Sequence, residues 1–140
     1  KKNITKILNR RLKRSDFMPF APMIRDVDAK KILENYSSED YSSRFMTITY
    51  NVKQKYHEKL RNILHLDNTF RVQIIDKIEN QLCYEILTNF FKKSGIPCII
   101  NTSFNVHDDP IVMSINDAIK ALNHEVIDLL VADHEVITKK

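Results

Sequence analysis

Polar side chains that could bind a ligand follow an apolar run near residue 100. Asn101-Thr102-Ser103-Phe104-Asn105 comes directly after residues 96–100, which are almost wholly apolar. Ligands of open α/β sheets bind beyond the carboxyl ends of the strands. The polar members of this segment donate and accept hydrogen bonds without a fixed charge. The candidate binding residues are therefore Asn101, Thr102, Ser103 and Asn105. The alternative interpretation is an ordinary turn held by side chain–backbone hydrogen bonds.

A second candidate segment is the strand-like run His65-Leu66-Asp67-Asn68-Thr69-Phe70-Arg71-Val72-Gln73. A period of two places Arg71 and Gln73 on one face of the strand, opposite the apolar side chains. The guanidinium of Arg71 is always charged and suits phosphate or carboxylate. His65 and Asp67 offer acid–base or metal-binding groups, but two residues do not make a metal site. A solvent-facing strand is the alternative.

Basic residues at the start of the chain form the third candidate. Lys13 and Arg14 precede a proline-bounded loop and suit phosphate, although they also fit an ordinary helix end. Much of the net charge of +4 lies in this region, in Lys1, Lys2, Lys6, Arg10, Arg11, Lys13 and Arg14. Such a cluster can meet a polyphosphate or a nucleic-acid backbone, or form a solvated helix face. No aromatic residue is interleaved, which argues against a base-stacking platform for nucleic acid.

The amino-acid composition limits the classes of protein to which this chain can belong. The 140 residues, with 43% apolar and 29% charged side chains, predict a single domain with a normal core. Gly95 is the only glycine, so the glycine-rich loops GxGxxG and GxxxxGK[ST] are excluded. We find no membrane-span pattern and no signal-peptide pattern. Cys83 and Cys98 lie in apolar settings without CxxC spacing, which predicts buried, reduced thiols in a cytoplasmic protein.

The elements that must position these residues can be read from periodicity and from turn signals. Apolar spacing and capping residues predict helices over residues 4–12, 28–36, 80–93 and 114–123. In the third helix, Leu82, Ile86 and Phe90 form the expected core stripe and Gly95 the left-handed cap. The prolines exclude helix over residues 17–22, and residues 37–43 are expected to form a loop.

Strand-forming composition completes the predicted elements. Strands are expected over residues 44–50, 69–75, 96–100, 128–131 and 136–137. The wholly apolar composition of residues 96–100 predicts a central strand that is buried on both faces. Helices that alternate with apolar strands predict an α/β or α+β domain with a mixed sheet and flanking helices.

Taken together, three segments resemble a known family. They are Lys13-Arg14-Ser15-Asp16-Phe17-Met18-Pro19-Phe20-Ala21-Pro22, the run from His65 to Gln73, and Asn101-Thr102-Ser103-Phe104-Asn105-Val106-His107-Asp108-Asp109-Pro110-Ile111-Val112. Their order is that of the carboxyl end of carbamoyltransferases of the nodulation-factor and antibiotic-tailoring type, whose pattern is roughly KR[ST]EFMPFAP, HxDGTxRxQ and NTSFNxxxEPIV. The resemblance covers nearly all of the chain. Asn68 and Asp108 stand where the family has glycine, and Asp109 where it has glutamate.

The resemblance implies a fold similar to that of threonylcarbamoyl-adenylate synthases, a twisted mixed sheet with a basic ATP-binding concavity. It implies that residues 1–140 are the carboxyl-terminal domain of a longer carbamoyltransferase. This domain would form carbamoyl adenylate from ATP and carbamoyl phosphate. A larger amino-terminal domain, with an iron-type metal and the acceptor pocket, would transfer the carbamoyl group to a hydroxyl or amine. Magnesium would arrive with ATP, and no metal site is expected in this chain.

The resemblance also assigns roles to residues. Arg71, Lys13 and Arg14 would stabilise the charge that develops on the phosphate oxygens. Ser103 and Asn105 match a Ser-x-Asn pair used on the nucleotide phosphate, with Asn101 and Thr102 beside them. His65 is a possible general base, and a structural histidine is the favoured assignment. The alternatives to an enzyme are a binding module for RNA or an anionic metabolite and a docking domain.

Overall fold

The computed structural model describes residues 4–15 and 18–139. The chain divides into two compact units, one built from residues 19–102 and the other from residues 1–18 and 103–140. Four residues named above lie outside the described ranges: Lys1 and Lys2 of the basic cluster, and Asp16 and Phe17 of the first motif. None of the helices in the described ranges is long and apolar enough to cross a membrane.

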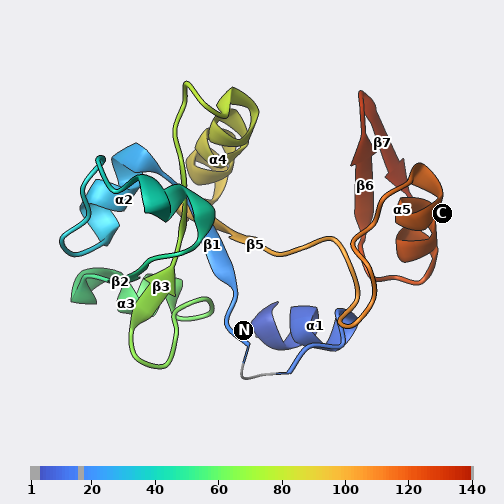
Figure 1. The fold of residues 1–140 in the computed structure, drawn as a ribbon, viewed down its shortest axis with the longest axis horizontal. Helices are drawn as coiled ribbons and strands as arrows, with labels where there is room; N and C mark the ends of the chain where they lie inside the picture. The colour runs from blue at the N-terminus through green and yellow to red at the C-terminus, as the bar shows by residue number, and fades with distance from the viewer. Residues whose placement is uncertain (1–3, 16–17, 140) are drawn as a thin grey trace. The chain divides into compact units, whose positions relative to one another are not determined.

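A three-stranded mixed sheet forms the centre of the unit of residues 19–102 (Figure 1). Its middle strand is β1 (Ala21–Arg25), with β4 (Gln73–Ile75) parallel to it on one side and β5 (Cys98–Asn101) antiparallel on the other. Helices and strands in this arrangement confirm the predicted α+β class and the mixed sheet.

The start of β1 contains a proline, which sequence analysis placed in an extended segment without recognising a strand. Pro22 pairs with Ile100 of β5. The register with β4 begins only at Met23, so the missing N–H of Pro22 lies outside that ladder. A proline therefore fits at the beginning of this central strand.

A second, two-stranded antiparallel sheet pairs β2 (Thr49–Asn51) with β3 (Thr69–Arg71). The chain then passes from β3 through Val72 into β4, so the predicted strand over residues 69–75 serves two sheets. The predicted alternation is confirmed. Phe70 and Val72 are completely buried, while Arg71 is exposed.

The predicted strand over residues 44–50 is largely wrong. A 3-10 helix, η1 (Tyr41–Phe45), occupies its first part and part of the expected loop, and only β2 is extended. The Asp40 carbonyl accepts hydrogen bonds from the backbone and side chain of Ser43, and Met46 ends the turn at a φ of 59°. These local bonds outweigh the strand propensity of the segment. The charged stretch after β2 contains η2 (Gln54–Tyr56) and α3 (His57–Leu60).

The core of this unit lies between the sheet and α2 (Asp26–Ile32), which begins two residues before the predicted 28–36 helix and ends four residues earlier. Ile24, Ile74 and Cys98 belong to one buried cluster with apolar residues of α2. Burial raises the pKa of the Cys98 thiol to about 12. Both cysteines are free, but Cys83 is only half-buried, which corrects the expectation that both are buried.

Helix α4 (Gln81–Ser94) matches the predicted helix in position, and Gly95 forms the predicted left-handed cap. Asn80 accepts a hydrogen bond from the backbone N–H of Cys83, and Gly95 has a φ of 69°. The predicted core stripe is wrong, however, because Leu82, Ile86 and Phe90 are 70%, 48% and 38% exposed. Leu87 is the buried residue of this helix.

The expectation that residues 96–100 form a central strand buried on both faces is also wrong. β5 is an edge strand of the three-stranded sheet. Cys98 is buried, whereas Ile99 and Ile100 are only half-buried. The uninterrupted apolar composition could not distinguish an edge position from a central one.

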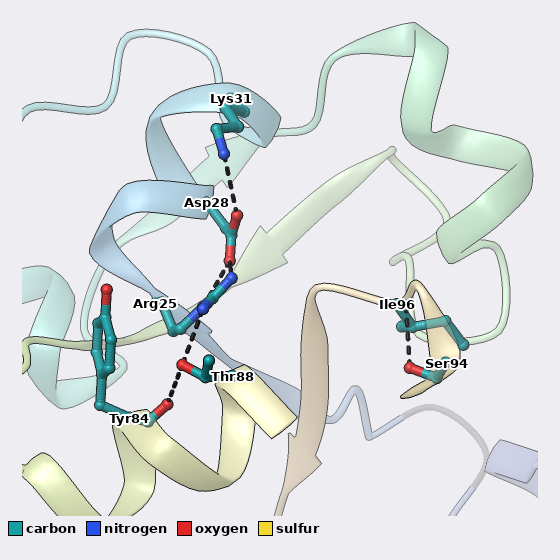
Figure 2. A network of polar contacts seen from close by, with 7 residues as sticks. All are labelled: Arg25, Asp28, Lys31, Tyr84, Thr88, Ser94 and Ile96. Atoms are coloured by element: carbon teal, nitrogen blue, oxygen red, sulfur yellow. Dashed lines mark hydrogen bonds and ion pairs between the residues drawn. The ribbon is translucent and has the colours of Figure 1, made fainter. Parts of the chain in front are cut away.

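The inner side of α4 faces a buried charge (Figure 2). Arg25, at the end of β1, donates from Nε to Asp28 Oδ2 at 2.7 Å, donates from Nη2 to the same oxygen, and donates from Nη1 to Thr88 Oγ1 at 2.8 Å. Thr88 Oγ1 in turn donates to the Tyr84 carbonyl at 2.8 Å. The guanidinium carbon lies 5.6 Å and 5.4 Å from the ring centroids of Tyr84 and Phe91.

The other unit packs α5 (Ile115–Asn123) on a hairpin of β6 (Leu129–Ala132) and β7 (Glu135–Thr138) (Figure 1). These elements and α1 (Ile4–Arg11) match the sequence predictions closely. Ser114 caps α5 by accepting a hydrogen bond from the Asp117 N–H, as the capping pattern predicted. Ala118, Leu122 and Leu130 form the small core.

We predict that Leu87→Ala destabilises the protein by about 2–5 kcal/mol because the side chain is fully buried. The matched variant Phe90→Ala should cost less than about 1.5 kcal/mol, since that ring is partly exposed. Urea unfolding followed by circular dichroism measures both. A larger loss for Phe90→Ala than for Leu87→Ala would contradict this packing of α4.

The ion pair generates a second prediction. In Arg25→Met the Asp28 carboxylate, whose side chain is 4% exposed, stays buried without its guanidinium, so stability should fall by about 3–5 kcal/mol. Lys31→Met is the control, because Lys31 also contacts Asp28 but its side chain is 65% exposed. Removing it should change stability by less than about 1 kcal/mol. Equal unfolding midpoints for Arg25→Met and wild type would refute the assignment.

Candidate functional site

The candidate residues belong to both compact units. His65, Arg71, Asn101 and Thr102 lie in the unit of residues 19–102, whereas Lys13, Arg14, Ser103 and Asn105 lie in the other. Within each unit the structure shows which of them lie together.

His65 begins a tight turn that leads into β3. Its backbone N–H donates to the Thr69 carbonyl at 3.1 Å. Its ring nitrogens Nδ1 and Nε2 lie 3.1 Å from Thr69 Oγ1 and 3.4 Å from the Phe20 carbonyl oxygen. Both nitrogens are therefore engaged inside the protein, which favours a structural role for His65 over that of a general base.

The same turn is held by Asp67. Its Oδ1 accepts hydrogen bonds from Thr69 N–H at 3.1 Å and from Thr69 Oγ1 at 2.7 Å. These hydrogen bonds lower the pKa of the Asp67 carboxyl below its usual value. Asn68 adopts a φ of 63°, the left-handed conformation that glycine would adopt most easily. The turn keeps its left-handed backbone at this position without glycine.

Arg71 projects from the polar side of β3. Its exposed side chain forms no hydrogen bond or ion pair with any residue in the described part of the chain. Its backbone is fixed by the pairing with Thr49 and by the fully buried neighbours Phe70 and Val72. An anchored strand thus carries a guanidinium that is available to an anion.

The carboxamide side chains of Asn101 and Gln73 are paired on the three-stranded sheet. Asn101 Nδ2, on β5, donates to Gln73 Oε1, on β4, at 2.6 Å, and lies 3.9 Å from the sulfur of Met46. The period of two predicts that Gln73 shares a face with Arg71, but the sequence assigned no binding role to Gln73. The signal was its position two residues after Arg71 in a strand of period two.

Ser103 and Asn105 are bonded to each other in the other unit. Ser103 Oγ donates to Asn105 Oδ1 at 2.5 Å, and Asn105 Nδ2 donates to the carbonyls of Val106 and Asp109 at 3.1 Å and 2.9 Å. Asn105 therefore organises its own loop. Ser103 is the exposed member of this pair, and Asn105 is half-buried.

The core and the backbone anchor this loop. Phe104 packs against the cluster of Ala118, Leu122 and Leu130, which confirms the expected inward orientation. The Val112 N–H donates to the Phe104 carbonyl at 2.9 Å. Asp108 has a φ of 69°, so it too occupies a left-handed position where the family pattern has glycine.

Lys13 and Arg14 follow the last turn of α1. Lys13 has a φ of 53°, and the Arg14 N–H donates to the Asn9 carbonyl at 2.8 Å, which is the geometry of a left-handed helix cap. Lys13 is exposed and Arg14 half-buried, while Thr102, in the other unit, is exposed. Over residues 4–15 and 18–139, no three His, Cys, Asp or Glu side chains are grouped so that they could hold a metal ion.

Comparison with known proteins identifies a matching family and several relatives of the chain. Residues 1–139 match the family model described as carbamoyltransferase C-terminus. An uncharacterized protein of Methanocaldococcus jannaschii is 37% identical over 139 residues, which cover 99% of this chain and 26% of that protein. Nodulation protein NolNO of Sinorhizobium fredii is 33% identical over 128 residues, covering 91% of this chain and 19% of that protein.

A third relative carries an activity in its name. The 3'-hydroxymethylcephem-O-carbamoyltransferase of Amycolatopsis lactamdurans is 27% identical over 112 residues, which cover 80% of this chain and 20% of that protein. The chain thus spans about a quarter or less of the length of these relatives. Because the family model spans nearly every residue, this chain belongs to the carbamoyltransferase C-terminus family.

Proposed function

We propose that this chain binds ATP and carbamoyl phosphate and forms carbamoyl adenylate, as one domain of a carbamoyltransferase. The observation that carries the proposal is Arg71, an anchored and exposed guanidinium without a protein partner among the described residues. It lies in the segment that resembles the family's second motif.

The proposed reaction balances with one water molecule. Carbamoyl phosphate and water yield carbamate and inorganic phosphate. An oxygen of carbamate then attacks the α-phosphorus of ATP, a new O–P bond forms, and pyrophosphate leaves with the electron pair of the broken bond. Both steps place negative charge on phosphate oxygens, which fixed guanidinium and ammonium groups stabilise without a covalent intermediate.

The residues have separate roles in this proposal. Arg71 binds the phosphate of carbamoyl phosphate through charge-assisted hydrogen bonds. Ser103 binds a phosphate of ATP, and Asn105 holds the loop that presents it. Lys13 and Arg14 add positive charge toward the nucleotide, and Mg²⁺ arrives on the ATP phosphates.

We propose that transfer to the final acceptor takes place on a larger domain, of the kind that the relatives' greater length allows, which carries the acceptor pocket and its metal. The carbamoyl adenylate formed here would be its donor substrate, and a hydroxyl or amine its acceptor.

The role of Arg71 is tested by substitution. Arg71→Ala should weaken carbamoyl phosphate binding roughly ten- to a hundredfold, since one charge-assisted contact contributes about 1.5–3 kcal/mol. Arg61→Ala is the matched control, because Arg61 is an exposed arginine of the same unit outside the three motifs. Titration calorimetry measures both variants. Unchanged binding in Arg71→Ala would remove this residue from the site.

The second test concerns the loop in the other unit. The double variant Ser103→Ala, Asn105→Ala should fold normally and bind ATP at least about tenfold more weakly, since it loses a phosphate contact and the loop's own hydrogen bonds. Pyrophosphate release from ATP, dependent on carbamoyl phosphate, should fall in parallel. If this release continues at the wild-type rate, or if RNA binds with steep salt dependence and no nucleotide preference, the binding-module alternative gains.

A further inference from the structure

The polar pair on the three-stranded sheet has a defined direction of hydrogen bonding. Asn101 Nδ2 has two hydrogens, and its two neighbours are the Gln73 oxygen at 2.6 Å and the Met46 sulfur at 3.9 Å, both acceptors. Asn101 Nδ2 is therefore bonded within the protein, and these contacts do not use Asn101 Oδ1. Because Gln73 Oε1 accepts this bond, Gln73 Nε2 remains as a donor.

The hydrogen-bonded pair keeps one donor, Gln73 Nε2, and one acceptor, Asn101 Oδ1. Within residues 4–15 and 18–139, neither Gln73 Nε2 nor Asn101 Oδ1 makes a further hydrogen bond, and neither is a buried atom lacking a partner. Both residues are half-buried on strands of one sheet. A donor and an acceptor on strands of one sheet make a two-point hydrogen-bonding pattern.

That pattern is complementary to a primary amide. A carbamoyl group carries a carbonyl oxygen that accepts a hydrogen bond and an NH₂ group that donates one. We infer that Gln73 and Asn101 recognise the carbamoyl group of carbamoyl phosphate, Gln73 Nε2 donating to its oxygen and Asn101 Oδ1 accepting from its nitrogen. This inference rests on the proposed function.

In this proposal Arg71 binds the phosphate group of the same ligand. Arg71 and Gln73 lie two residues apart on the polar side of one run of chain, which corresponds to roughly 6–7 Å along a strand. The buried residues Phe70, Val72 and Ile74 alternate with them and fix that side. One segment thus offers a cation for the phosphate and a carboxamide for the acyl group.

The three residues contact two kinds of group on the ligand. Arg71 and Gln73 Nε2 meet groups that every acyl phosphate has, namely phosphate and carbonyl oxygen. Only Asn101 Oδ1 meets the NH₂ group that distinguishes a carbamoyl from an acetyl group. Gln73 and Met46 additionally hold Asn101 in the orientation that presents this oxygen.

Acetyl phosphate is therefore the matched probe, since a methyl group replaces NH₂. We expect the wild-type chain to bind carbamoyl phosphate on the order of tenfold more tightly than acetyl phosphate in calorimetric titrations. Asn101→Leu should lose most of this preference through weaker carbamoyl phosphate binding. Its retained affinity for acetyl phosphate then shows that the variant is folded.

Two variants of Gln73 test its positioning role. Gln73→Glu keeps an acceptor for Asn101 Nδ2 but loses the Nε2 donor, so both ligands should bind more weakly while their affinity ratio persists. Gln73→Met removes the acceptor as well, so the ratio should approach one. Arg71→Ala should weaken both ligands and preserve the ratio.

The outcomes distinguish the inference from the function on which it rests. If the wild-type chain binds neither acyl phosphate, the proposed function fails and this inference with it. If it binds both equally, or if Asn101→Leu retains the preference, carbamoyl phosphate remains the proposed substrate, but Gln73 and Asn101 do not recognise it.

Discussion

The ion pair between Arg25 and Asp28 is the constraint on which the larger unit depends. It lies where β1 ends and α2 begins, and Thr88 of α4 bonds the same guanidinium (Figure 2). Three elements thereby meet at one buried charge, and any displacement of one leaves a group unpaired. This accounts for the orientation of α4, whose Tyr84, Thr88 and Phe91 side faces inward while its apolar stripe faces outward.

Left-handed backbone in a chain with a single glycine is the second constraint. The structure places Asn68 at a φ of 63° and Asp108 at 69°, two positions where the family pattern has glycine. Asparagine and aspartate tolerate this conformation better than other side chains do. The turns before β3 and after Asn105 therefore keep their shape, at the expense of some backbone strain, and still position the neighbouring polar residues.

Sequence alone predicted the elements whose signals are local. Gly95 marked the end of α4 and Ser114 the start of α5, and alternation around Arg71 identified its exposed side. The sequence did not predict which faces are buried or which side chains pair when these depend on residues distant in the chain. The stripe of α4 could not be assigned to solvent without knowing that Arg25 occupies the other side, and the partner of Gln73 lies on a strand 28 residues away. Residue types suggest candidates, but long-range pairing selects among them.

The passage of one extended segment between two sheets explains how its polar side can stay exposed while its backbone is held. Phe70 and Ile74 are buried on either side of Val72, so both sheets hold the segment from its apolar side. Its polar side then needs no packing of its own, and Arg71 can stay exposed without loss of backbone order. Because the core orders the segment, its position does not depend on contacts of the Arg71 guanidinium.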